Sequence, residues 1–207
     1  GHERVGVATL EASYLTTTAT DAVKAQAVAP GKTQRFDQLI RSLARTQSFS
    51  LAYFARQEAG PASRLVPVAS ADTRENLADL PPEIMVALAS DELLTKVACG
   101  SSQSGLLQSG QRVLSVGAFP ACVDGKLLGV VAGVVFIDDA FLDAQSRDDD
   151  ELSLALVSRT GVVASVGDQA SRSTLIDLAN ETIADGSAHL RSTSDRYLAS
   201  SPVPKDR

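Results

Sequence analysis

The sequence contains no tryptophan, one methionine and two histidines among its 207 residues. His2 follows Gly1 at the start of the chain and can be a remnant of cloning, which leaves His189 as the one histidine for chemistry. A metal site built from several histidines is therefore excluded. A Ser-His-Asp triad would depend on a single candidate.

Cysteine is equally scarce, because the chain has only Cys99 and Cys122. Their spacing is not that of metal ligands. They can form one disulfide in an oxidising compartment, or they can be two buried thiols. The residues alone leave both alternatives open.

The chain also lacks basic clusters and long hydrophobic runs. Its formal charge is −6, which argues against binding to nucleic acid. The longest apolar run, 127–137, has about half of the roughly 20 residues that a membrane-spanning helix needs. No signal peptide is visible. The hydrophobic content of 44% is that of an ordinary globular protein.

Three short motifs fail as functional sites. "PGKT" at 30–33 lacks the glycine that a phosphate-binding loop needs at position 26, which is Gln26. "GSSQSG" at 100–105 does not have the Gly-x-Ser-x-Gly spacing of a serine hydrolase, and we expect a loop there. "DDDE" at 148–151 lacks the spaced oxygens of a calcium loop and is typical of a solvated linker.

The segment "DGKLLGVVAGVVFIDD" at 124–139 predicts half of a β-hairpin. Asp124-Gly125 is a strong hairpin signal, because both central residues of a type I′ turn need positive φ. The apolar segments on either side predict strands at 112–123 and 126–137. The second strand is apolar throughout and should be central in a sheet. A glycine such as Gly129 in a central strand indicates the close approach of another group.

The rest of the chain alternates between helical and strand patterns. We predict a helix at 3–29 that ends at Pro30-Gly31, and a second helix at about 34–47 capped by Thr33. Strands follow at 49–55 and 65–70, and Pro67 makes the second an edge strand or breaks it. A helical stretch runs over 82–98, with a fresh N-cap at Ser90, Asp91 and Glu92, and 106–107 is a short strand.

An internal repeat follows the acidic stretch "DAQSRDDDE" at 143–151, which is the best domain boundary. "SLALVS" at 153–158 echoes "SLAYFA" at 50–55, and "VVASVGD" at 162–168 echoes "PVASAD" at 67–72. A helix at about 174–184 follows, with Gly186 as its C-terminal stop. "ASSPVPKDR" at 199–207 then resembles "GAFPACVDG" at 117–125. The repeat predicts two strand-strand-helix-strand-strand units, with the closing strand of the second missing.

These patterns resemble the double Cache (PDC-type) sensor domains, which are the extracytoplasmic parts of bacterial histidine kinases, chemoreceptors and diguanylate cyclases. The resemblance lies in "SFSLAYFARQ" with "RLVPVASAD", in the helix at 82–98, and in "VLSVGAFPACVDGKLLGVVAGVVFIDDAFLD". It implies an α+β fold with a long N-terminal helix at 1–34. A membrane-distal PAS-like ligand-binding unit with an antiparallel sheet would follow at 35–145. A smaller, incomplete, membrane-proximal PAS-like unit would occupy 146–207.

The resemblance further implies a periplasmic sensing module anchored through flanking membrane helices, and we expect a two-component histidine kinase first. Such a module binds a small molecule, with an organic acid as one candidate, and has no catalysis and no cofactor of its own. The amino-acid-binding branch of the family uses Trp, Arg and Tyr, and Trp is absent here. We weigh two alternatives from other classes: a small hydrolase or transferase that uses Ser or Asp, and a homodimerisation module.

For the ligand pocket we expect aromatic, hydroxyl and charged side chains that face the glycine-lined sheet. Tyr, Arg and hydroxyl groups in such a place can orient a polar or anionic molecule. The alternative is that the aromatic residues are core and the arginines are surface. The candidate ligand-binding residues are Tyr53, Arg56, Ser70, Asp72, Arg74, Ser115, Phe119 and Asp138.

Overall fold

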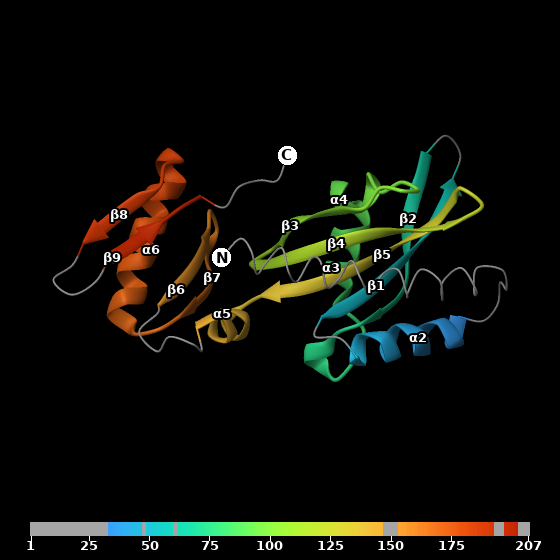
Figure 1. The fold of residues 1–207 in the computed structure, drawn as a ribbon, viewed down its shortest axis with the longest axis horizontal. Coiled ribbons are helices and arrows are strands. Elements are labelled where there is room, and N and C mark those ends of the chain that lie inside the picture. Colours follow the sequence, from blue (N-terminus) through green and yellow to red (C-terminus); the bar gives the residue numbers. More distant parts are fainter. Residues whose placement is uncertain (1–32, 47–48, 60–61, 147–152, 193–196, 203–207) are drawn as a thin grey trace. The chain divides into compact units, whose positions relative to one another are not determined.

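The computed structural model describes residues 33–46, 49–59, 62–146, 153–192 and 197–202, and they divide into two compact units (Figure 1). Unit 1 contains the described residues up to Ser109 together with Leu114–Val135. Unit 2 contains Gly110–Val113 and the described residues from Phe136 onward. The helix expected at 3–29 lies outside the described residues.

The chain is α+β, and its largest element is a five-stranded antiparallel sheet in the order β2-β1-β5-β4-β3. Helix α2 (Thr33–Arg45) precedes the first strand in the chain. The strands are β1 (Ser50–Ala59), β2 (Ala62–Ala71), β3 (Gln103–Ser109), β4 (Arg112–Val123) and β5 (Lys126–Ile137). Between β2 and β3 lie the short helices η1 (Thr73–Glu75), α3 (Pro82–Ser90) and α4 (Glu92–Thr95).

The predicted hairpin at 112–137 is confirmed to the residue, with β4 and β5 at the expected bounds. Asp124 (φ 50°) and Gly125 (φ 75°) both have positive φ, as a type I′ turn requires. β5 occupies the centre of the sheet, as its unbroken apolar sequence predicts. Antiparallel pairing joins Ser50–Ala55 of β1 to Gly129–Val134 of β5.

Successive side chains of β1 point to opposite faces of this sheet. Leu51 and Tyr53 belong to a buried apolar cluster with Ile40 and Ala44 of α2. Phe54 points to the opposite face because neighbouring residues of a strand alternate, and it is completely buried. Helix α3 packs against β2 and β3 and buries Ile84, Met85 and Leu88.

Pro67 lies on an edge strand, as the sequence predicts, because β2 is the end strand of the sheet that the described residues form. Tyr53 pairs with Ala69 and Phe54 pairs with Pro67, so Val68 is an extra residue in a β-bulge. A proline has no N–H for the ladder, and an edge or a bulge tolerates that loss.

Several predicted bounds in unit 1 need correction. The predicted helical stretch at 82–98 ends at Thr95, and its second part is capped by Asp91, whose side chain accepts from the Leu93 N–H at 2.8 Å. Ser90 is not the cap, since its hydroxyl donates to the carbonyl of Val86. The predicted loop at 100–105 is also partly wrong, because β3 begins at Gln103.

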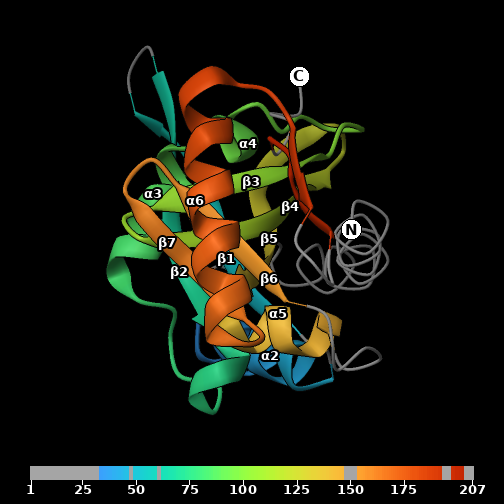
Figure 2. The ribbon, with the colours of Figure 1, turned by 90° about the vertical axis from the view of Figure 1, so that its left-hand side faces the viewer.

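Unit 2 repeats the order strand-strand-helix-strand-strand. Its elements are β6 (Leu154–Ser158), β7 (Gly161–Val166), α6 (Gln169–Asp185), β8 (His189–Ser192) and β9 (Tyr197–Ser200). The strands form two separate hairpins, β6–β7 and β8–β9, and both contact α6 (Figure 2). Leu175 and Leu178 of α6 contact Leu198 of β9 in one small cluster, against which Ala155 of β6 packs.

Helix α6 ends as predicted, with Gly186 (φ 74°) as its C-cap. It begins five residues before the predicted start because Asp168 is the N-cap, and its side chain accepts from the Ser171 N–H at 3.0 Å. The expected turn at Asp206 lies outside the described residues, so the missing closing strand stays a prediction.

A helix that the sequence analysis missed, α5 (Asp139–Ser146), occupies the first part of the predicted polar stretch at 143–151. Asp138 begins it by accepting from the Phe141 N–H at 2.9 Å, and Leu142 is buried. Helix α5 packs on β6 and β7, and Asp139 accepts from the Ser165 N–H at 2.7 Å. These contacts place α5 in unit 2, whereas the predicted domain bounds put residues up to 145 in the first unit.

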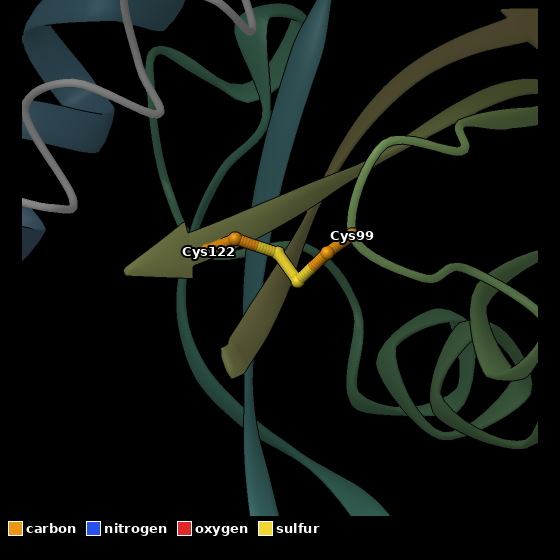
Figure 3. The surroundings of a disulfide bond; sticks show 2 residues. All are labelled: Cys99 and Cys122. Carbon is orange, nitrogen blue, oxygen red and sulfur yellow. A yellow bond between two sulfur atoms is a disulfide. The ribbon is translucent and has the colours of Figure 1, made fainter. Parts of the chain in front are cut away.

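A disulfide joins Cys99, which follows α4, to Cys122 near the end of β4 (Figure 3). The Cα atoms are 6.0 Å apart, and the two residues are separated by 23 positions in the sequence. The bond ties the connection between α4 and β3 to the sheet. Of the two alternatives that the sequence left open, the structure has the disulfide.

We expect the double substitution Cys99→Ser with Cys122→Ser to lower the free energy of unfolding by about 3 kcal/mol, because the unfolded chain loses its closed loop. Urea unfolding of both proteins measures the difference. A reducing agent should lower the wild-type midpoint to that of the double variant and leave the variant unchanged. An unchanged wild-type midpoint under reduction would contradict the role of the bond.

We expect Gly129→Ala to destabilise the protein by about 2 kcal/mol or more, because there is no room for a methyl group. A Cβ at this position would lie 2.4 Å from the carbonyl oxygen of Phe54 and 2.6 Å from the Tyr53 hydroxyl. Gly105→Ala is the matched control, since its Cβ would meet only the Leu93 side chain, at 3.0 Å. Equal unfolding midpoints for the two variants would refute the close approach at Gly129.

Candidate functional site

A group of connected polar side chains in unit 1 lies where β2 ends. We call Ser50, Ser70, Asp72 and Arg74 the Asp72 cluster. Asp72 Oδ1 accepts from the Ser50 hydroxyl at 3.0 Å, from the Arg74 N–H at 3.0 Å and from Arg74 Nε at 3.1 Å. Asp72 Oδ2 accepts from Arg74 Nη2 at 2.7 Å. The carboxylate is therefore held by a two-pronged guanidinium contact, a hydroxyl and a backbone N–H.

Local sequence explains this geometry. Asp72 is the N-cap of η1, and an Asp at a cap accepts a backbone N–H two residues later. The Ser50 hydroxyl also accepts from the Thr73 N–H at 3.1 Å, which joins the start of β1 to the end of β2. Ser70 accepts from the Leu80 N–H at 2.9 Å. This bond joins the end of β2 to the segment that leads into α3.

Burial and charge act in opposite directions on Asp72. Desolvation of the fully buried carboxylate raises its pKa, while the hydrogen bonds and charge of Arg74 and the Ser50 hydroxyl lower it. The net direction is a pKa below the usual value. The carboxylate is therefore ionised at neutral pH and paired, which is the condition under which a buried charge is tolerated.

Three of the eight predicted ligand residues, Ser70, Asp72 and Arg74, belong to this cluster. Arg74 is the member that solvent reaches, with 37% of its side chain exposed against 0% for Asp72. Ser50 and Ser70 are 1% and 3% exposed. A molecule from solution would therefore meet Arg74 first.

The two aromatic candidates lie elsewhere, in the apolar cluster under α2. Tyr53 is 8% exposed and packs in the cluster that contains Ile40 and Val131, and Phe119 is partly buried against the same cluster. Burial raises the pKa of the Tyr53 hydroxyl. Their placement agrees with the alternative that the aromatic residues are core.

The remaining three candidates are scattered. Arg56 is exposed on β1, and Ser115 is buried at 6% exposure on β4. Asp138 is in unit 2, where it caps α5. The structure does not gather these residues with the Asp72 cluster in one unit, since Asp138 belongs to the other.

The sequence analysis did not identify Ser50 and Thr73 as partners in this site. It also did not identify the contacts of Arg41 with residues 77–79. Arg41 Nε donates to Asp37 Oδ2, four residues earlier on α2, at 2.9 Å. Arg41 also donates through Nη2 to Asp79 Oδ1 at 2.6 Å and through Nη1 to the carbonyl of Leu77. No sequence spacing gives these contacts, because residues 36 and 38 positions apart are joined.

The chemistry available in this site is ionic recognition. Asp72 is the carboxylate that could act as a base for the Ser50 hydroxyl, but Arg74 lowers the basicity of this carboxylate, and Ser50 is buried. Among the described residues, no group of three or more His, Cys, Asp and Glu side chains is placed to hold a metal ion. None of the described helices combines the length and apolar character needed to cross a membrane.

Asp72→Asn tests the Asp72 cluster. A lowered folded-state pKa contributes stability above the usual value of about 4, and this contribution disappears as the pH falls through the folded-state pKa. We expect the variant to lose roughly 1–3 kcal/mol at pH 7, and the gap from the wild type to narrow below about pH 4. Urea unfolding from pH 7 to pH 3 measures both.

The control for this prediction is Glu92→Gln, which removes an exposed ion pair with Lys96 on α4. It should change stability little at any pH, because exposed pairs are screened by water. A pH-independent gap between Asp72→Asn and the wild type would show that the ionised carboxylate contributes nothing.

No family model matches the chain, and no curated protein matches it. Among solved structures, the chain is similar to the sensory domain of the Campylobacter jejuni chemoreceptor Tlp3 (CcmL), crystallised with isoleucine bound. The identity is 10% and the TM-score is 0.41, over 93% of this chain and 82% of that one. Because the TM-score is below 0.5, we derive neither the function nor the ligand of this chain from that likeness.

Proposed function

We propose that this chain is the extracytoplasmic small-molecule sensing part of a transmembrane signalling receptor. The observation that carries the proposal is the order of elements. Unit 1 has two strands, helices and further strands in one antiparallel sheet, and unit 2 repeats strand-strand-helix-strand-strand. Two successive units of this kind are what the resemblance to double Cache sensors implies.

The disulfide supports the extracytoplasmic part of the proposal. Disulfides persist in oxidising compartments such as the bacterial periplasm and are rare in the cytosol. Cys99 is exposed, so cytosolic reductants would reach the bond. A periplasmic location is consistent with the bond being formed.

We propose a small anionic ligand, such as an organic acid, and place it on unit 1. Arg74 and Arg56 are the exposed cations of the candidate set, and a guanidinium binds a carboxylate through two hydrogen bonds. The buried Asp72 would hold Arg74 in place, and the buried Ser70 would hold the end of the following segment through the Leu80 N–H. Ser115, Tyr53 and Phe119 would support the sheet beneath, and Asp138 would act as the α5 cap.

For the output, we rank a two-component histidine kinase first and a chemoreceptor or a diguanylate cyclase as alternatives, with the chain itself non-catalytic. The intact membrane protein distinguishes them. Transfer of phosphate from ATP to a histidine of that protein is expected. Cyclic diguanylate synthesis, or no phosphotransfer in the presence of ligand, would move the proposal to an alternative.

The sensing role is tested by a thermal-shift screen of the chain against organic acids, amino acids, amines and purines. A ligand at 100 times its Kd adds about 2.7 kcal/mol of stability, which corresponds to several degrees in Tm for a chain of this size. We expect a hit among the organic acids that is lost in Arg74→Gln and retained in Arg56→Gln, because Arg56 lies six residues along β1 from Ser50, which bonds Asp72 beside Arg74.

Arg64→Gln is the matched control, because Arg64 is an exposed arginine of the same β1–β2 hairpin that bonds Gln57 and is not in the candidate set. This variant should retain the shift. A hit that all three variants retain would place the ligand elsewhere. No hit in any class would count against small-molecule sensing.

A further inference from the structure

Residues 72–80 form a loop, here called the 72–80 loop, that contains a strained turn. Asn76 has φ 52° and Leu77 has φ 64°, and the Ala78 N–H donates to the Glu75 carbonyl at 3.0 Å. This is the arrangement of a type I′ turn, whose second central position strongly favours glycine. A leucine in this region has its Cβ too close to the following carbonyl oxygen, so the turn is unfavourable by itself.

Contacts at both ends of the loop hold the turn in place. At its start, the Asp72 N–H donates to the Ala78 carbonyl at 2.7 Å, and the Leu77 N–H donates to the Asp72 carbonyl at 2.9 Å. The Leu77 side chain packs against the apolar cluster that includes Ile40 and Ala44 of α2. Leu77, the strained residue, is therefore part of the surface against which α2 packs.

Arg41 makes the polar contacts between α2 and the same loop. Its Nη1 donates to the Leu77 carbonyl, its Nη2 donates to Asp79 Oδ1 at 2.6 Å, and its Nε donates to Asp37 Oδ2 at 2.9 Å. Three different nitrogens thus bind three acceptors, two of them on the loop. A planar guanidinium can do this, and the single ammonium of lysine cannot reproduce that fixed fork.

We propose that the 72–80 loop and α2 form one two-state switch, with Arg41 as the positioning residue that couples them. In the first state the turn is strained and α2 is held through Arg41 and Leu77. In the second state the turn relaxes, and α2 loses both contacts together. Strain of this kind persists only where surrounding contacts impose it, so removing those contacts shifts the equilibrium.

In the receptor proposed above, this switch would connect the end of β2 to α2. That use depends on the proposed function, but the coupling does not. Its test needs no ligand, so its failure would leave the sensing proposal intact, and a failed ligand screen would leave the coupling intact.

The test is amide hydrogen exchange on the whole chain, read at three places: α2, the 72–80 loop and the β4–β5 hairpin. Arg41→Lys should speed exchange in α2 and in the loop together, by about tenfold or more, and leave β4–β5 unchanged. Lys96→Gln, which removes an exposed ion pair elsewhere in unit 1, should change none of the three.

A pair of substitutions at Leu77 separates strain from packing. Leu77→Ala and Leu77→Gly remove the same packing, but only glycine relieves the positive φ. We expect α2 and the loop to exchange roughly threefold to tenfold more slowly in Leu77→Gly than in Leu77→Ala. Equal exchange in the two variants would overturn the strained state. Faster exchange in the loop of Arg41→Lys with α2 unaffected would overturn the coupling.

Discussion

The antiparallel pairing of β1 with β5 is the constraint on which unit 1 depends. The β1–β2 and β4–β5 hairpins are local, and this pairing, from Ser50↔Val134 to Ala55↔Gly129, joins them into one sheet. It requires Gly129, over which the Tyr53 ring lies. Once β1 is fixed, its first residue, Ser50, reaches Asp72, and Leu51 and Tyr53 form the surface on which α2 packs. The polar site and the helix contact are therefore both consequences of one strand pairing.

Sequence patterns predicted those parts of the fold that depend on neighbouring residues. The Asp124-Gly125 turn fixed the register of β4 and β5, because a two-residue type I′ turn leaves no freedom in which residues pair. Pro67 indicated an edge, and Gly186 ended α6, for equally local reasons. The unbroken apolar sequence of β5 predicted its central position in the sheet, since only a strand covered on both faces tolerates such a sequence.

An acidic side chain can cap a helix or bind a ligand, and the sequence alone does not distinguish these two roles. Asp138, one of the predicted ligand residues, begins α5, and its ligand role stays a prediction. Asp72 is in part a cap as well, and its ligand role stays a prediction. The cluster around it joins residues 22 positions apart, and Arg41 reaches Asp79 over 38 positions. Such partners follow from the three-dimensional path of the chain, which periodicity does not encode.

The polar site and the strained turn share the 72–80 loop, and this connects recognition with conformational change. Asp72 neutralises Arg74 at the start of the loop, and Arg41 binds Leu77 and Asp79 near its end. An anion that bound Arg74 would share the guanidinium with Asp72 and weaken that ion pair. A buried carboxylate that lost its partner would be destabilised, so the loop would favour a state in which Asp72 is solvated or paired anew. Such an anion would have different affinities for the two states, which is the one way in which binding can shift a conformational equilibrium.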